Sequence, residues 1–158
     1  MDNLIPKAFN AEQVSQKLGG GWNYSAVFSN AVFALKSCCG DRFRLLASVD
    51  IKVGEQIVTP AIAIYPPKPL DKANDQLVMN QMPLVVIEID SLLRPFSQLI
   101  AQVQAQLWAG IQSCWVIQPR MQCVFLFTAP QTYTFWQVPQ ILIDPATGIE
   151  LPLAPLFE

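Results

Sequence analysis

The sequence contains no histidine. Without an imidazole, the chain can form neither a Ser-His-Asp triad nor a Cys-His pair, and it lacks the commonest side-chain ligand of transition metals. Charged residues are also scarce, at 14% of the chain against roughly 25% in typical soluble domains. The surface must therefore carry many uncharged polar or apolar side chains, which favours a protein partner or self-association.

Long apolar runs are missing too. No stretch of about 18 uncharged apolar residues is present that could span a bilayer, and the first residues lack the basic start and apolar segment of a signal peptide. We therefore expect a cytoplasmic protein with no membrane partner. The net charge of −2 gives no overall attraction to phosphate groups, which argues against a nucleic-acid partner.

The four cysteines lack the Cys-x-x-Cys spacing of zinc sites, and proteins of the cytoplasm rarely keep disulfides. They are Cys38, Cys39, Cys114 and Cys123. Their apolar surroundings indicate buried or half-buried thiols that behave as small hydrophobic side chains. No cofactor is expected from them.

The chain has the usual length of one domain, and 52% hydrophobic residues are enough for a sizeable core. We expect a single domain over residues 1–158. In its first half, a short helix is expected at Asn10–Leu18, and helical spacing favours a second over Ser25–Leu35, where the aromatic and β-branched content leaves a strand as the alternative. Alternation of apolar residues predicts one strand over Leu45–Val53 and a second over Ile57–Tyr65. Pro66–Met82 has no periodicity and is expected to be a surface loop, either a lid or a docking segment.

The second half has clearer periodicity. The run Pro83–Ile89 is apolar except for Glu88, as in a central strand covered on both faces. An apolar stripe predicts a helix over Phe96–Trp108, and Cys114–Ile117 with Cys123–Thr128 is typical of a hairpin. Shorter strands are expected at Tyr133–Val138 and Ile141–Ile143. This order of elements predicts an α/β fold, a mixed sheet flanked by helices.

Four stretches, in this order, resemble a family of restriction-endonuclease-like proteins. They are Thr59–Ile64, Pro83–Ser91, Ala109–Pro119 and Thr147–Leu153. The family is the Uma-two type of the PD-(D/E)xK nuclease superfamily, common in cyanobacteria, and the likeness covers Val49 to the end. It implies a restriction-endonuclease-like fold in which an Asp and a Glu hold a divalent metal and a Lys helps to position water.

Departures from the family pattern fall on the residues that the chemistry needs. The Asp that should follow Pro60 is replaced by Ala61, and the helical Lys falls on Gln102. Of the three positions, only Glu88 keeps its residue type. The last lysine of the chain is Lys72, and the nearby cation is Arg94, whose guanidinium is a poor substitute for a catalytic amine. We therefore expect no catalytic residue, only vestigial positions at Ala61, Glu88 and Gln102.

A further loss lies near the N-terminus. The family tends to have an acidic residue in a Tyr-Glu-like motif, and the corresponding segment Trp22–Ser25 has none.

The leading hypothesis is a catalytically degraded relative that serves as a protein-interaction or homo-oligomeric module. The alternative is a divergent Mg²⁺- or Mn²⁺-dependent DNA endonuclease that uses Glu88 and Asp90, which lie two residues apart and point to the same face of a strand. A third possibility is a protein that binds nucleic acid without cutting it, for which the acidic balance is unfavourable.

Several polar and aromatic side chains have two interpretations each. Glu88 is either a relic metal ligand or a carboxylate satisfied by backbone N–H groups at a strand end. Asp90 is most simply a strand-end residue. One row of helix glutamines is either a solvated face or a polar groove for a partner: Gln98, Gln102 and Gln106. Three tryptophans are either core residues or interface anchors: Trp108, Trp115 and Trp136.

Overall fold

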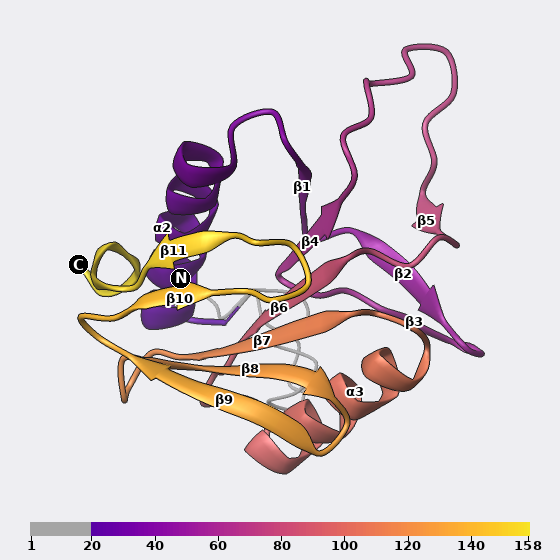
Figure 1. Ribbon diagram of the computed structural model, residues 1–158. Helices are drawn as coiled ribbons and strands as arrows, with labels where there is room; N and C mark the ends of the chain where they lie inside the picture. Colours follow the sequence, from indigo (N-terminus) through magenta and orange to yellow (C-terminus); the bar gives the residue numbers. More distant parts are fainter. Residues whose placement is uncertain (1–19) are drawn as a thin grey trace, which may run out of the picture.

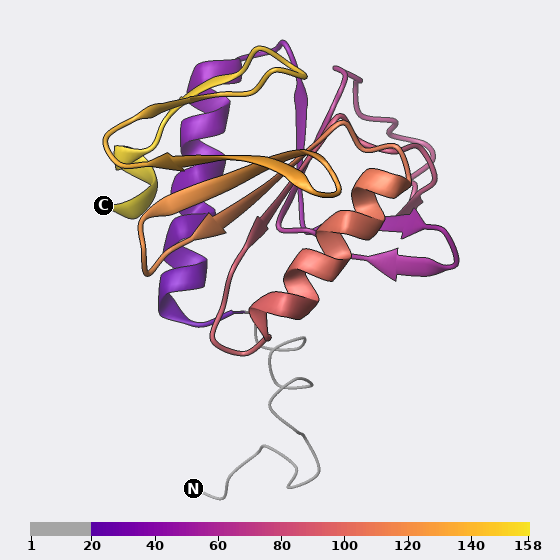
Figure 2. The same ribbon diagram turned by 60° about the horizontal axis from the view of Figure 1, so that its bottom comes forward.

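A computed structural model describes residues 20–158, so the helix expected at Asn10–Leu18 lies outside the described residues. The centre of the protein is a six-stranded mixed sheet with the order β1-β4-β6-β7-β8-β9. Helices α2 (Trp22–Cys39) and α3 (Phe96–Trp108) lie on opposite faces of this sheet (Figures 1 and 2). The mixed α/β architecture expected from the order of elements is confirmed.

The strands of the central sheet are short. They are β1 (Arg44–Ala47), β4 (Ile62–Tyr65), β6 (Val85–Ile89), β7 (Ser113–Gln118), β8 (Cys123–Ala129) and β9 (Thr132–Gln137). Strands β6 and β7 run parallel, while the other neighbours are antiparallel. Helix α3 makes the crossover that a parallel pair requires. The predicted helix over Phe96–Trp108 and the predicted hairpin are both confirmed.

All five residues of β6 are buried, as the continuous apolar run predicts for a central strand. Successive side chains of a strand point to opposite faces, so β6 contributes to two apolar layers. Ile87 packs in the layer beneath α2 with Leu35, and Val86 packs in the layer beneath α3 with Leu99 and Val103. The candidate site lies where the α3 layer meets this strand.

The C-terminal segment completes the α2 side. Strands β10 (Ile141–Ile143) and β11 (Glu150–Pro152) form a separate hairpin, followed by the 3₁₀ helix η1 (Ala154–Phe157). Asn30 of α2 donates a hydrogen bond from Nδ2 to the Leu156 carbonyl at 3.1 Å. This contact ties α2 to the end of the chain.

The prediction of one strand over Leu45–Val53 is wrong. Two strands, β1 and β2 (Asp50–Val53), belong to different sheets. Between them Ser48 has a φ of 53°, a left-handed conformation that turns the chain. The alternation of apolar residues continues through the break because each strand buries one of its faces.

The strand expected over Ile57–Tyr65 also divides in two. It forms β3 (Gln56–Val58) and β4, separated by Thr59-Pro60-Ala61, because proline has no N–H to donate to a sheet. Strands β3 and β2 pair with β5 (Val78–Met79) in a small three-stranded sheet of order β3-β2-β5. Apart from β5, most of the predicted loop Pro66–Met82 is irregular and exposed, and Figure 1 shows it extending from the body of the molecule.

The four cysteines are free thiols. Burial raises the pKa of Cys39 to about 12, and it also raises the pKa of Cys114 above the ordinary thiol value. These two thiols therefore stay protonated at neutral pH, and buried protonated thiols are chemically inert. No helix of the described residues is long and apolar enough to cross a membrane.

Candidate functional site

The candidate site is centred on Glu88, the charged residue of the buried strand β6. Its side chain is 5% exposed. It points to the α3 face, where two helix glutamines donate to the same carboxylate oxygen. Gln102 Nε2 lies 2.8 Å from Glu88 Oε1, and Gln106 Nε2 lies 3.1 Å from it. One oxygen of the carboxylate is therefore held by two neutral amides.

The second oxygen faces a cation. Arg94, in the connection between β6 and α3, places Nη2 3.7 Å from Glu88 Oε2. The same guanidinium donates from Nη1 to Gln102 Oε1 at 3.0 Å. Glu88, Arg94 and Gln102 thus form a closed network of one ion pair and two hydrogen bonds. We call these three residues with Gln106 the Glu88 network.

These contacts correct one sequence interpretation of Glu88. The backbone N–H partners expected at a strand end are not its partners, because the hydrogen bonds described for this carboxylate come from side chains. The reason is positional. Glu88 lies inside β6, where the backbone N–H and C=O groups are used in the pairing with β7. The hydrogen-bond partners of the buried carboxylate therefore come from helix α3 and the connection before it.

Burial raises the pKa of the Glu88 carboxyl, and this effect outweighs the nearby Arg94 charge and the amide hydrogen bonds, which lower it. The pKa of a nearby tyrosine is also shifted. Burial also raises the pKa of Tyr24, at the beginning of α2, with a smaller contribution from the negative charge of Glu88. Both shifts have the same physical cause, which is that a dry site disfavours negative charge.

The glutamines of α3 do not form the solvated row proposed from their spacing. Gln98 is exposed, but Gln102 is half-buried and Gln106 is fully buried. The three glutamines have the expected i, i+4 spacing, but α3 lies across β6, and Gln102 and Gln106 therefore contact Glu88. A fully buried Gln106 cannot contact a partner chain either, so the groove interpretation is also wrong for that residue.

The structure brings two of the three vestigial positions together. Gln102 donates to Glu88 in the layer beneath α3. Ala61 lies one residue before β4, whose Ile62 is opposite Ile87 of β6, and it is buried in the apolar layer beneath α2. Glu88 and Gln102 are therefore in direct contact, while Ala61 packs in the other layer.

Asp90, just after β6, has a partner of its own. Its Oδ2 accepts a hydrogen bond from Gln118 Nε2 at 2.6 Å, while Gln118 Oε1 is buried without a partner among the described residues. Asp90 lines an open cleft of about 270 Å³ together with Tyr24, Gln118 and Arg120. The cleft lies beyond the carboxyl ends of the parallel strands β6 and β7, the usual place for ligands in sheets with this connection.

The described residues contain no group of three acidic or cysteine side chains arranged to hold a metal ion. The surroundings of Glu88 also do not fit a divalent cation. Metal ligands are oxygen acceptors, whereas Gln102 and Gln106 direct N–H groups at the carboxylate and Arg94 already supplies positive charge. Chemically, the Glu88 network is suited to hold a carboxylate in place.

Sequence reasoning identified Glu88 and noted Arg94 as a nearby cation, but it missed their pairing and the roles of Gln106 and Gln118. The one available signal was the lone charge in a dry strand, which needs partners from a covering element. The tryptophans also divide. Trp115 is fully buried and Trp136 packs partly against the core, whereas Trp108 is 81% exposed.

No protein-family model and no curated protein sequence matches this chain. Among solved structures, it is similar to a protein of Anabaena variabilis ATCC 29413, described as "a putative nuclease belonging to DUF820". The TM-score is 0.75 at 21% sequence identity, over 87% of this chain and 81% of the other. At that identity the likeness establishes the fold, and the chain has a nuclease-like fold built on a mixed sheet flanked by helices.

Proposed function

We propose that this chain is a non-cleaving relative of the Uma-two type of PD-(D/E)xK nucleases, and that it serves as a protein-interaction or homo-oligomeric module. The observation that carries the proposal is the ion pair between Arg94 and Glu88, closed by Gln102. In a metal-dependent nuclease, this carboxylate would need a free oxygen for the metal. Here a guanidinium and two amides engage both oxygens.

The residue types at the other two positions support the same proposal. The methyl group of Ala61 cannot ligate a metal, and the amide of Gln102 is neutral and cannot serve as the amine of the nuclease motif. Each replacement removes one part of the chemistry. The Glu88 network then acts as a structural brace between β6 and α3.

The proposed partner is a protein or a second copy of the chain, in the cytoplasm, with no cofactor. The low charge and the number of exposed apolar side chains, among them Trp22, Phe33 and Trp108, support a protein contact over nucleic acid. Nucleic acid would be attracted by a basic surface, and the net charge of −2 provides none overall.

The cleft beside Asp90 favours the second candidate function, a divergent Mg²⁺- or Mn²⁺-dependent DNA endonuclease that uses Glu88 and Asp90. In that case Asp90 would have to release Gln118, and Glu88 would have to release Arg94, before a metal could bind between them. Both contacts oppose this activity.

A cleavage assay on supercoiled plasmid and single-stranded DNA with Mn²⁺ distinguishes the two functions. We expect the wild type and Glu88→Gln to be equally inactive. The restored chain should combine Ala61→Asp and Gln102→Lys with Arg94→Ala, because the guanidinium would otherwise still compete with the metal. We expect this chain to bind Mn²⁺, measured as a rise in melting temperature, and to cut DNA.

The matched control is the restored chain that also carries Glu88→Gln, which should lose both the Mn²⁺ response and cleavage. Cleavage by the wild type that Glu88→Gln abolishes would refute the proposal and establish the metal-dependent endonuclease.

A further inference from the structure

The outer edge of the central sheet at β9 is open. Strand β9 pairs with β8 on one side, and no other strand of the part of the chain that the structure describes pairs with its outer side. Five of its six residues are exposed. An edge strand presents unpaired N–H and C=O groups, which form a template for a further strand.

This edge lacks the charges that usually protect such strands. No Asp, Glu, Lys or Arg occurs in residues 121–143, a span that contains β8, β9 and β10. The opposite edge strand, β1, begins with Arg44, whose guanidinium donates two hydrogen bonds to the Lys68 carbonyl. Proteins commonly place charged residues on sheet edges to prevent pairing with another chain, and β9 has none.

The α3-side face of β9 is aromatic and partly exposed. Tyr133 is 55% exposed and Phe135 is 45% exposed. Both rings pack edge-on against Phe125 of β8, with centroids 5.7 Å and 5.4 Å away, and Phe96 of α3 lies 6.1 Å from the same ring. The cluster is therefore organised but still half in water, and cross-strand aromatic pairs are among the contacts that stabilise sheets.

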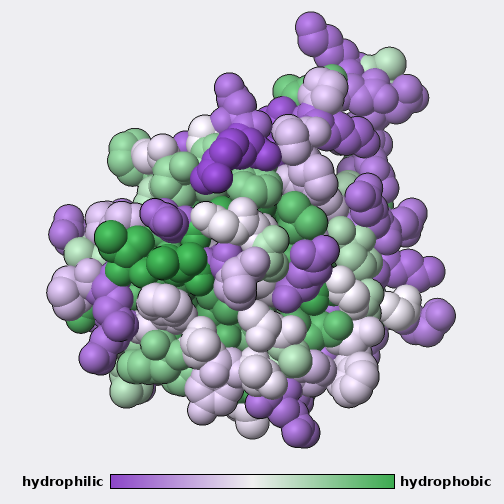
Figure 3. All heavy atoms as spheres, in the orientation of Figure 1, coloured by the Kyte–Doolittle hydropathy of each residue, from purple (hydrophilic) through white to green (hydrophobic). Residues whose placement is uncertain are grey.

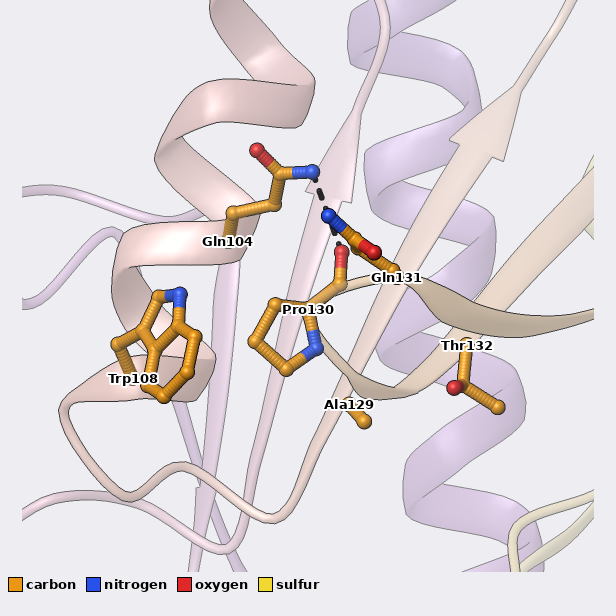
Figure 4. Close-up of a pocket in the computed structure, with 6 residues that line it drawn as sticks. All are labelled: Gln104, Trp108, Ala129, Pro130, Gln131 and Thr132. Carbon is orange, nitrogen blue, oxygen red and sulfur yellow. Dashed lines mark hydrogen bonds between the residues drawn. The ribbon is translucent and has the colours of Figure 1, made fainter.

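The uncharged surface continues from β9 towards α3. A pocket of about 290 Å³ lies between the exposed Trp108 and the turn that joins β8 to β9, from Ala129 to Thr132. Figure 4 shows the Trp108 indole on one side of this pocket and the turn on the other. Gln104 donates a hydrogen bond to the Pro130 carbonyl. Figure 3 shows hydrophilic residues gathered over the loop Pro66–Met82, with pale and green residues predominating where β8 and β9 lie.

The edge meets the requirement for pairing with a second copy of the chain. Under a two-fold axis, one strand pairs with its own copy in the antiparallel sense, so residue i meets residue j while j meets i, and only the residue nearest the axis meets its own copy. A charge near the axis would then meet its own sign. Because β9 is uncharged, its self-pairing carries no repulsion, and the two sheets would join into one.

We infer that β9 is a homodimer interface, in which its outer edge pairs antiparallel with β9 of a second copy and the Tyr133 and Phe135 rings extend the contact on the α3 side. This inference rests on the proposed function and names the partner of that module. The expected dimer has the N-terminus of each β9 beside the C-terminus of the other.

Sedimentation of the full chain tests the inference with substitutions at Thr134, in the middle of β9. Its hydroxyl accepts a hydrogen bond from the Trp136 indole at 2.9 Å. Thr134→Val removes that acceptor but keeps a β-branched residue, and it is the matched control. Thr134→Lys and Thr134→Glu remove it and add a charge near the two-fold axis.

We expect the wild type and Thr134→Val to sediment as dimers at micromolar concentration. We expect Thr134→Lys and Thr134→Glu each to sediment as monomers, at half the dimer mass, with unchanged circular dichroism. Mixed in equal amounts, the two charged variants should form a heterodimer, because opposite charges then meet across the axis. A folding defect would not produce that recovery.

A monomeric wild type would overturn the inference, and so would dimers of Thr134→Lys alone. Neither result bears on DNA cleavage, so a monomeric wild type that does not cut DNA would remain consistent with the non-cleaving assignment. A dimer that cuts DNA would refute that assignment and leave the interface intact.

Discussion

Two buried carboxyl groups of this protein differ in the kind of partner that holds them. Asp144, just after β10, is fully buried and accepts hydrogen bonds from Ser113 Oγ at 2.6 Å and from the backbone N and Oγ1 of Thr147 at 3.0 and 2.5 Å. Glu88 is held by an arginine and two glutamines from α3 and its connection. Burial is similar in the two cases, and the chemistry differs.

The difference shows that burial of a carboxyl group does not by itself mark a functional site. Two of the hydrogen bonds to Asp144 come from Thr147, three residues away, inside the turn that joins β10 to β11, so this group is a local brace. Glu88 draws its partners from α3 and the connection before it, and one of those partners is a cation. The type and origin of the partners therefore carry the functional information.

The largest effect is expected at the local brace. Asp144→Ala removes three hydrogen bonds at once and leaves the buried Ser113 hydroxyl without its acceptor. Each bond contributes about 1 kcal/mol, and an unsatisfied buried group costs about 1–3 kcal/mol. We expect the free energy of unfolding to fall by about 4 kcal/mol, measured by urea denaturation.

Asp144→Asn is the control for this change, because its amide oxygen keeps one acceptor and its volume fills the same space. It should lose about half as much. A negligible loss in Asp144→Asn beside a full loss in Asp144→Ala would mean that packing, and not hydrogen bonding, is what Asp144 contributes.

The comparison also shows which parts of the structure the sequence could predict. Strand β6 was predicted from its continuous apolar run and helix α3 from its apolar stripe, because in both elements the local pattern and the tertiary burial agree. Glu88 was recognisable as one charge in a dry strand. Asp144 carried no such signal, because a carboxyl group beside a proline and a threonine is typical of any surface turn.

Errors arose where two distant elements decide the outcome together. The alternation over Leu45–Val53 continued through the turn at Ser48, since both strands bury one face and the period cannot reveal a change of sheet. The burial of Gln102 and Gln106 depends on how α3 crosses β6. A row of polar residues on a helix has the same spacing whether water or a buried carboxylate lies opposite.

An intermediate effect is expected when the cation is removed from Glu88. Arg94→Met leaves Glu88 Oε2 without its ion-pair partner, but Arg94 is 32% exposed, so water partly screens the pair and the loss is smaller than for a fully buried one. We expect about 2 kcal/mol less unfolding free energy at neutral pH. Arg120→Met, at an exposed arginine, should cost less than about 0.5 kcal/mol.

A double-mutant cycle with Glu88→Gln isolates the pairwise interaction. Once residue 88 is neutral, Arg94→Met should cost much less than it does in the wild type. If the cost is the same in both backgrounds, the arginine stabilises the chain through packing and the ion pair carries no weight.

The smallest effect is expected for Glu88→Gln, and it depends on pH. Glutamine keeps an oxygen that can accept from Gln102 and Gln106, so the loss at low pH should stay within about 1 kcal/mol.

Burial raises the pKa of Glu88 above its ordinary value of 4.5, against the lowering effect of Arg94. The folded chain therefore holds this proton more tightly than the unfolded chain, and the resulting stabilisation is fully present below pH 4.5 and is lost as pH rises through the raised pKa. Glutamine does not titrate, so the stability advantage of the wild type over Glu88→Gln should shrink as pH rises from 4 to 8, measured by denaturant titration at each pH. An advantage that grows over this range would mean that Arg94 and the amides outweigh burial and that the carboxylate is held ionised in the folded chain.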